Sequence, residues 1–483
     1  MNLLKLYCTF AAQKNKTYCF ALILNLFQFI YMKTIKLKKG LNIEISGKAS
    51  LHVASMSQPE TVAIVPDDFK GITPKVAVKE GDTVKAGSVL FFDKTHPELK
   101  IVSPVSGTVV EVARGERRKL LYISVKRDIE TTYEQFNKVD LNAKREEILS
   151  ALLEAGFGGF FRQRPYDVIA NPTIAPKAIF ISAFDSAPLA PDYNFILKGQ
   201  ASQVQAGLSV LAKLTEGNVY YSVCPSTSAE LKNMKDVEIN EFVGAHPAGN
   251  VGVQINHLNP INKGEVVWTV NIQDVALIGR FATSGVVNLT KTIAVAGPEV
   301  IEPAYVKTVY GTSIAAITNC NITKGVKVRY INGDVLSGAQ VAETGVLSPF
   351  ANLVSVIAEG DTADEFIGWA MPRLNKFSNS NLFATKIIRK LFPKKQFEFD
   401  ARILGGERAF IMSGELEKVF PMDIMPEQLL KAMITKNLDK MEQLGAYEVA
   451  PEDFGLCEFV CTSKMELQKI VRESLDYMKK ELE

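Results

Sequence analysis

The sequence has few of the residues that hold clusters, metals and disulfides: six Cys and four His among 483 residues. Disulfide-dependent domains are far denser in Cys, so we expect a reducing compartment. A [4Fe–4S] cluster needs four thiolates, commonly spaced C-x2-C-x2-C-x3-C-P. The tail offers only Cys457 and Cys461, while Cys224 and Cys320 stand alone. We therefore predict no cluster and no metal site, and interpret Cys457 and Cys461 as buried, inert thiols.

Strong charge of one sign and long apolar runs are also missing. The net charge is +2, so nothing global favours nucleic acid. The apolar run 19–31 is too short to cross a bilayer, which takes about 20 apolar residues, and no small-x-small cleavage site follows it. An alternating strand pattern starts directly at Met32 and ends at Gly40. We interpret residues 1–31 as a non-native extension and Met32 as the true start; a membrane anchor is the alternative.

A chain of this length predicts several domains, and residues 32–135 are β-rich. The pattern V-x-E-G-D-x-V-x-A-G occupies 78–87 and S-P-V-S-G-T-V occupies 103–109. These two turns resemble those of the flattened β-barrel of lipoyl and biotinyl carrier domains. Lys94 stands at the carrier position, but the segment 95–100 lengthens its hairpin. We expect a barrel that serves as a rigid docking module, with a lipoyl or biotin carrier as the alternative.

Residues 136–285 alternate between helix and strand patterns, which predicts a parallel, Rossmann-like α/β domain. Ligands of such sheets lie at the carboxyl ends of the strands, here the Asp185 loop. The Gly156–Gly159 loop with Arg162 and Arg164 could hold a phosphate or flavin, which would suit a flavin- or NADH-binding dehydrogenase subunit. It lacks a full glycine fingerprint. The predicted elements are a helix at 141–156 with Leu141 on its apolar face, a strand at 177–183, a helix at 200–213 and a strand at 218–224.

The β pattern returns over 286–365, and a basic segment occupies 366–400, without Asp or Glu as far as Phe397. This segment is either a solvated loop or a docking site for anionic lipid or a membrane subunit. Residues 401–483 are predicted as a helical C-terminal domain, with one helix from Pro426 and a capping box at Ser463–Glu466 before another. The candidate docking residues of the basic segment are Lys386, Arg389, Lys390, Lys394 and Lys395.

Three further segments resemble one family. They are His246 to Gly279 with Trp268, Gly405 to Pro426, and Glu452 to Cys461 followed by Arg472-Glu-Ser-Leu-Asp476. In this order behind a carrier-like barrel, they resemble the A subunits (NqrA) of the Na+-translocating NADH:quinone oxidoreductases (Na+-NQR), and the match runs from Met32 to the end. The resemblance implies a carrier-like barrel, a Rossmann-like domain, a β-grasp (SLBB-like) module and a helical C-terminus.

The resemblance also implies a role. The chain would be the peripheral subunit, on the cytoplasmic face of the bacterial membrane, of a pump that couples NADH oxidation and quinone reduction to Na+ export. Its partners would be the other five subunits, chiefly the membrane-embedded B subunit that carries flavin. NADH, FAD, FMN, riboflavin and the 2Fe–2S centre would belong to those partners, and this chain would bind no cofactor, with quinone as a possible ligand.

His246 and His257 are candidates for a quinone site because quinone reduction takes up protons and His exchanges protons near neutral pH. Both lie in a Gly/Asn/Pro-rich stretch that we expect to be a loop. Structural hydrogen bonding is the alternative role for each. Gly249 and Trp268 complete the candidate quinone or interface set, and Trp268 and Trp369 could equally be core anchors. We assign no catalytic residue.

Overall fold

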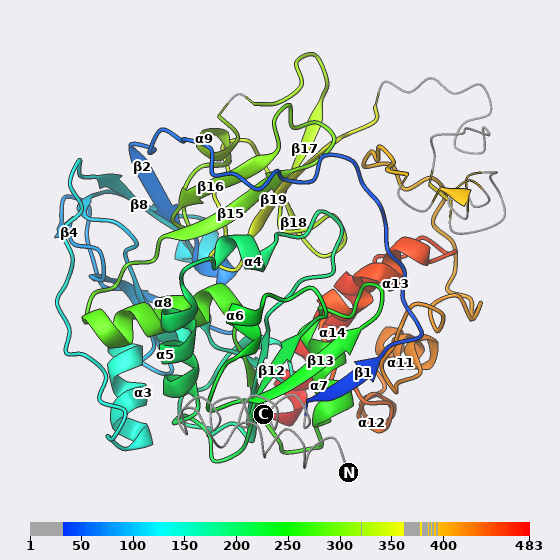
Figure 1. The fold of residues 1–483 in the computed structure, drawn as a ribbon, viewed down its shortest axis with the longest axis horizontal. Coiled ribbons are helices and arrows are strands. Elements are labelled where there is room, and N and C mark those ends of the chain that lie inside the picture. The colour runs from blue at the N-terminus through cyan, green and yellow to red at the C-terminus, as the bar shows by residue number, and fades with distance from the viewer. Residues whose placement is uncertain are drawn as a thin grey trace, which may run out of the picture.

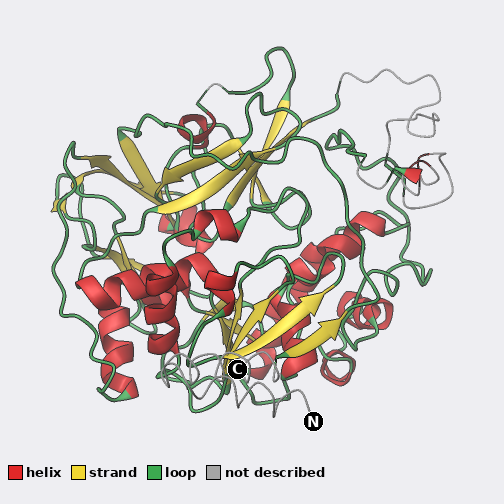
Figure 2. Cartoon of the chain, in the orientation of Figure 1, coloured by secondary structure: helices red, strands yellow, loops and turns green. Residues whose placement is uncertain are grey.

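The computed structural model describes residues 32–319, 321–361, 377–378, 385, 388, 391–392 and 395–483. A β-barrel, an α/β sheet, a five-stranded sheet and a group of C-terminal helices pack side by side (Figure 1, Figure 2). One hydrophobic core runs through the barrel, the α/β sheet and the C-terminal helices, and a smaller core lies within the five-stranded sheet region. Among the described residues, every helix is too short or too polar to cross a membrane.

The barrel consists of a four-stranded sheet of order β2-β8-β7-β4 and a three-stranded sheet of order β3-β5-β6. Alternate residues such as Val62, Ile64, Ile123 and Val125 point inward and are buried. This confirms the predicted carrier-like barrel. The strands are β2 (Thr61–Ile64), β3 (Pro74–Val76), β4 (Thr83–Val84), β5 (Val89–Asp93), β6 (Lys100–Val102), β7 (Gly107–Arg114) and β8 (Leu120–Arg127).

The α/β domain is built on a seven-stranded sheet of order β1-β13-β12-β11-β14-β9-β10. Its first five strands are parallel, and β9 and β10 form an antiparallel edge. The Rossmann-like prediction is confirmed. The strands are β1 (Lys33–Lys36), β9 (Arg162–Arg164), β10 (Val168–Ile169), β11 (Ala178–Ser182), β12 (Val219–Val223), β13 (Glu238–Val243) and β14 (Val267–Thr269).

Strand β1 differs from the prediction in its partner. The strand forms where the pattern from Met32 predicts it, but it pairs with β13 of the α/β sheet instead of joining the barrel. The chain then crosses the five-stranded sheet before it reaches β2 (Figure 1). An alternating pattern predicts a strand but not its neighbour, because pairing depends on residues far away in the sequence.

Helices cover the α/β sheet, and their ends follow simple capping rules. Helix α8 starts where the Asn271 side chain accepts the Gln273 N–H, and it ends at Gly285 with a φ of 72°. The predicted helix at 141–156 begins later, at Arg145, so that Leu141 lies outside it and is exposed. The helices are α3 (Arg145–Glu154), α4 (Tyr193–Ile196), α5 (Ala201–Leu211), α6 (Ala229–Lys232), α7 (Val251–Leu258) and α8 (Ile272–Ser284).

The five-stranded sheet, of order β16-β15-β19-β17-β18, is mixed, as the β-grasp prediction requires. A buried polar network joins it to α8: Lys291 Nζ lies 2.5 Å from Asp274 and donates to Pro349 O, while Gln273 bonds Thr292 and Asn352. The network fixes the relative position of the two units. The elements are β15 (Lys291–Ala296), β16 (Ala304–Thr308), α9 (Ile314–Thr318), β17 (Val328–Asn332), β18 (Ala339–Val341) and β19 (Leu353–Ala358).

The C-terminal helices pack on the α/β sheet beside α7. The helix predicted from Pro426 is present, but the capping box at Ser463 is not formed: the helix begins at Leu467, and Ser463 Oγ donates to Ala409 O instead. A local sequence motif cannot indicate that the Ala409 carbonyl, 54 residues away, accepts the hydrogen bond of the Ser463 hydroxyl. The helices are α11 (Pro426–Ile434), α12 (Leu438–Gln443), α13 (Gly455–Val460) and α14 (Leu467–Leu482).

Candidate functional site

The predicted ligand loop after β11 packs against the His246 segment at the carboxyl ends of the parallel strands. Ser186 Oγ lies 3.1 Å from His246 Nδ1 and accepts the Gly249 N–H at 2.8 Å. A Cβ on Gly249 would lie 2.6 Å from Ser186 N, so this position needs glycine. The His246 backbone N–H donates to Asn42. The structure therefore brings together His246, Gly249 and the loop of Asp185, but it closes them with internal hydrogen bonds.

Two side chains in this region have shifted pKa values of opposite direction. Burial lowers the pKa of His246 to about 4, although Asp334 opposes the shift, so the imidazole is neutral at physiological pH. The Asp185 side chain is partly exposed, but the surrounding protein removes much of its water. This desolvation raises its pKa to about 6, although the hydrogen bond from the Ala187 N–H lowers it in part. The hydrogen bond between His246 Nδ1 and Ser186 Oγ is thus a structural arrangement, and it leaves Nδ1 unavailable to a ligand.

His257 and Trp268 lie apart from this loop. The stretch around His257 is not a loop, because 251–258 form α7, where His257 Nδ1 donates to Val253 O at 2.9 Å. Trp268 is completely buried in β14 and stacks on Phe161 at 5.3 Å, so it is a core side chain. Trp369 lies outside the described residues.

The Gly-rich loop proposed for a phosphate or flavin is a buried 3-10 turn, η3 (Phe157–Phe160). A Cβ on Gly159 would lie 2.6 Å from Ile101 Cδ1, so the glycines allow close packing against the barrel. Arg162 pairs with Asp167 at 2.5 Å, and the buried Arg164 donates to Asp453 at 2.7 Å and Glu452 at 2.8 Å. Burial alone would lower the pKa of Arg164, but the neighbouring carboxylates outweigh burial and raise it, so the guanidinium stays charged. The loop and its arginines are thus occupied by packing and ion pairs, which weighs against the alternative of a phosphate or flavin cradle here.

Three other predicted features can be placed. Lys94 is exposed directly after β5, in a turn that Asp93 braces by accepting the Thr73 and His96 N–H groups. Lys395 packs over the ring of Phe397 at 5.6 Å; Lys386, Arg389, Lys390 and Lys394 lie outside the described residues.

Cys457 and Cys461 are buried free thiols, and burial raises the pKa of Cys457 well above its usual range. In the part of the chain that the structure describes, no three His, Cys, Asp or Glu side chains could hold a metal ion.

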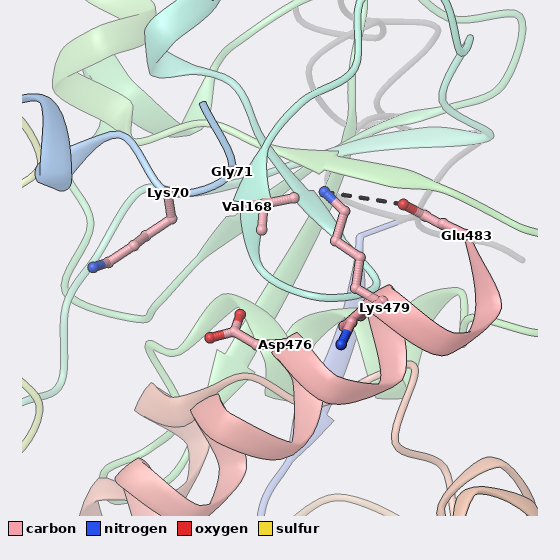
Figure 3. Close-up of a pocket in the computed structure, with 7 residues that line it drawn as sticks. Lys70, Gly71, Val168, Asp476, Lys479 and Glu483 are labelled. Atoms are coloured by element: carbon pink, nitrogen blue, oxygen red, sulfur yellow. Dashed lines mark ion pairs between the residues drawn. The ribbon is translucent and has the colours of Figure 1, made fainter. Parts of the chain in front are cut away.

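An open groove lies at the opposite edge of the sheet, between β10 and the end of α14. Its volume is about 470 Å³, and Figure 3 shows Asp476 and Lys479 of the helix facing Val168 and the Lys70–Gly71 turn. Lys479 lies 3.9 Å from Glu483. The seven lining residues are Lys70, Gly71, Val168, Asp476, Lys479, Lys480 and Glu483.

The groove combines an apolar wall with cationic donors. Val168 is buried in β10, and the lysine side chains add their alkyl stems to the wall. Volumes of roughly 300–1,000 Å³ are typical of small-molecule sites. Five of the seven lining residues are charged, namely Lys70, Asp476, Lys479, Lys480 and Glu483, so the groove is more polar than most such sites. The sequence did not reveal this place, because its walls come from the barrel, the sheet edge and the last helix. The only local sign was the Arg472–Asp476 spacing within one of the segments that carry the family resemblance.

Comparisons with protein families match three segments of the chain. Residues 35–128 match the NqrA N-terminal barrel-sandwich hybrid domain, 143–287 the NqrA second alpha/beta domain, and 292–343 the NQRA C-terminal domain of SLBB type. These segments coincide with the barrel, the α/β sheet and most of the five-stranded sheet.

Full-length relatives share this arrangement. A protein of Pasteurella multocida, named as the A subunit of a Na(+)-translocating NADH-quinone reductase, is 36% identical over 451 residues, covering 92% of this chain and 100% of the relative. Proteins of the same name from Haemophilus influenzae and Rhodopirellula baltica are 36% and 35% identical over 454 residues, covering 92% of this chain and 100% and 98% of those relatives. Among solved structures, an NAD+-reducing [NiFe]-hydrogenase aligns with a TM-score of 0.34 at 14% identity, covering 72% of each chain, a similarity too low to indicate function.

Proposed function

Because the chain belongs to the NqrA family, the A subunits of the Na(+)-translocating NADH-quinone reductases, we propose that it serves this multisubunit enzyme by docking to its partners and by binding quinone in the groove beside α14. The assembled complex is the enzyme, and we assign no catalytic residue to this chain. The observation that carries the quinone proposal is the open groove, which has an apolar wall and lysines on both sides.

The chemistry of a quinone suits this groove. A quinone has a flat apolar ring and two carbonyl oxygens that accept hydrogen bonds. Val168 and the lysine stems offer an apolar surface, and Lys70 and Lys480, which line the groove from the barrel side and the helix side, carry ammonium groups that can donate hydrogen bonds. A pocket with an apolar body and few polar anchors fixes the orientation of such a ligand.

The second candidate place is the region of His246, Gly249, His257 and Trp268. The position of the loop at the carboxyl ends of the strands favours it. The pKa of His246, which burial lowers to about 4, weighs against proton exchange there near neutral pH. The internal bonds of Ser186 to His246 and Gly249 weigh against it, as does the complete burial of Trp268. We therefore place the quinone in the groove.

Docking is proposed to involve the basic segment 366–400 and the membrane partners, chiefly the flavin-carrying B subunit among the other five, at the cytoplasmic face. Supporting this, Leu391 and Phe392 are 68% and 63% exposed next to Lys394 and Lys395. Apolar side chains among lysines suit a membrane-proximal surface. Electrons would pass through NADH, FAD, FMN, riboflavin and 2Fe–2S groups on the partners, and the coupling of quinone reduction to Na+ export would belong to the complex.

The quinone proposal is tested with a matched pair of substitutions on one helix. Lys480 lines the groove and Lys469 does not, yet both are exposed lysines of α14. Lys480→Trp should fill the groove and weaken binding of a short-chain ubiquinone at least about tenfold, or about 1.4 kcal/mol, whereas Lys469→Trp should leave it unchanged. Equilibrium binding to the full chain and the KM for quinone of the assembled complex are the measurements. Equal affinities for the two variants would refute the proposal.

A further inference from the structure

The hairpin that carries the apolar wall of the groove has an unusual backbone. Between β9 and β10 the chain turns through Tyr166 and Asp167, whose φ angles are 74° and 52°. Two consecutive non-glycine residues in the left-handed region are costly unless the surrounding structure holds them. Val168, which lines the groove, follows directly. The position of the wall therefore depends on whatever keeps this turn closed.

One side chain of α14 holds both residues of the turn. Arg472 Nη2 donates to Tyr166 O at 2.6 Å, and Nη1 donates to Asp167 O at 3.1 Å. The Asp167 carboxylate lies 3.8 Å from Arg472 and 2.5 Å from Arg162. The two carbonyls thus meet one planar, always charged guanidinium that matches a pair of acceptors.

The same guanidinium also fixes the facing wall. Arg472 Nε and Nη2 donate to Asp476 Oδ1 at 3.0 and 2.7 Å, one helical turn further along α14. Asp476 lines the groove opposite Val168 (Figure 3). All three guanidinium nitrogens of Arg472 donate hydrogen bonds, and these bonds link the two walls of the groove. The Arg472 side chain is 21% exposed, so it is not a buried core group.

We propose that Arg472 is the positioning residue of the groove: it closes the Tyr166–Asp167 turn and orients Asp476, and so sets the width and shape in which quinone binds. This inference rests on the proposed function of the groove. It also gives a role to the Arg472-Glu-Ser-Leu-Asp476 segment. Lys cannot replace this arginine, because an ammonium has no planar fork for two carbonyls.

The test uses the full chain and three variants: Arg472→Ala, Arg472→Lys, and Lys469→Ala as the control. Lys469 forms an exposed ion pair with Glu466 on the same helix, away from the turn. We expect Arg472→Ala to weaken binding of a short-chain ubiquinone about tenfold and Arg472→Lys to lie between it and the wild type. Lys469→Ala should bind as the wild type does.

Hydrogen exchange supplies a local readout that a general loss of stability would not produce. The Ile169 N–H donates to Lys70 O and the Ala170 N–H to Phe161 O, so these amides report on the hairpin. In Arg472→Lys they should exchange faster while the α14 amides keep their protection. Wild-type affinity and wild-type exchange at Ile169 and Ala170 in Arg472→Lys would overturn the inference, even if Arg472→Ala did not fold.

The outcome also separates this inference from the proposed function. If Lys480→Trp abolishes quinone binding and both Arg472 variants bind normally, the groove is the quinone site but Arg472 does not position it. If Lys480→Trp has no effect, the groove does not bind quinone, and the hairpin exchange alone shows whether Arg472 holds the turn.

Discussion

The His246 loop and the α14 groove differ in how far their polar groups are already partnered. In the loop, Ser186 bonds both His246 and the Gly249 backbone, and the backbone N–H of His246 bonds Asn42. In the groove, Lys70 and Lys480 flank a cavity of about 470 Å³. The loop contains residue types that often take part in catalysis or binding, whereas the groove contains open space that a ligand could occupy.

The difference shows that chemically suggestive residues are not sufficient for a site. Gly, His and Asn in a short stretch also make a tightly hydrogen-bonded loop, since buried polar groups must find partners. A groove, in contrast, arises where separate elements meet without filling the space. Substitutions in the loop and in the groove should therefore have separate effects on stability and on quinone binding.

The largest effect is expected from the buried pair of Arg164 and Asp453, which joins β9 to the C-terminal segment before α13. Asp453→Ala removes one of the carboxylates that neutralise the buried Arg164 guanidinium. The side chains of Asp453 and Arg164 are 0% and 2% exposed, so water cannot replace the lost partner. Breaking one partner of such a pair costs about 3–5 kcal/mol. Urea unfolding of the full chain measures it. The exposed Asp439→Ala of α12 is the control and should stay within about 0.5 kcal/mol of the wild type; similar losses for both would show that the pair gives no special support.

Ser186→Ala should separate stability from quinone binding. It deprives the Gly249 N–H and His246 Nδ1 of their partner, and an unpaired, largely buried polar group costs roughly 1–3 kcal/mol. Quinone affinity should not change, because the groove is untouched. Thermal unfolding and quinone titration of the same preparation measure the two effects. A loss of quinone affinity at unchanged stability would move the site to the His246 loop.

The pH dependence of stability should expose the opposite shifts of His246 and Asp185. A His whose pKa is lowered to about 4 on folding destabilises the fold as pH falls from about 6.5 towards 4. An Asp whose pKa is raised to about 6 destabilises it as pH rises from about 4 towards 6. The two slopes offset each other between about pH 4 and 6.

Asp185→Asn removes one of these slopes. In this window the variant should gain stability with rising pH more steeply than the wild type, and the difference should be small because solvent reaches the Asp185 carboxylate. The free energy of unfolding at a series of pH values measures it. Parallel pH profiles would show that Asp185 titrates normally.

The smallest effect is expected from a single lysine of the groove. Lys70→Gln removes the charge but keeps a donor, and an exposed hydrogen bond contributes only about 0.5 kcal/mol. Quinone affinity should therefore fall roughly twofold. A change as large as that of Lys480→Trp would mean that the charge of Lys70, not the shape of the groove, determines binding.

Much of the fold follows from the sequence, because its signals are local. The turns at 78–87 and 103–109 predict the barrel, and the buried strands around Ile179 and Tyr221 predict the parallel sheet. The errors concern long-range choices. Strand β1 pairs with β13, and Ser463 donates to the Ala409 carbonyl, each a partner that local patterns cannot identify.

The groove was beyond sequence reasoning for the same physical reason. Lys70, Val168 and Asp476 belong to three segments that only the folded chain brings together. The turn held by Arg472 is similar, since nothing in the pattern of 162–169 indicates two left-handed residues. The place of the Asp185 loop, by contrast, follows from the alternation of helix and strand patterns, because the carboxyl ends of parallel strands share one edge.

Photoaffinity labelling of the assembled complex with a photoreactive short-chain quinone tests the central claim most directly. Peptide mapping of this chain should find the label on the Lys70–Gly71 turn, around Val168, or in the last turns of α14, and excess unlabelled quinone should abolish it. A label confined to the segment from His246 to His257, or a label on this chain that competing quinone does not displace, would contradict the account.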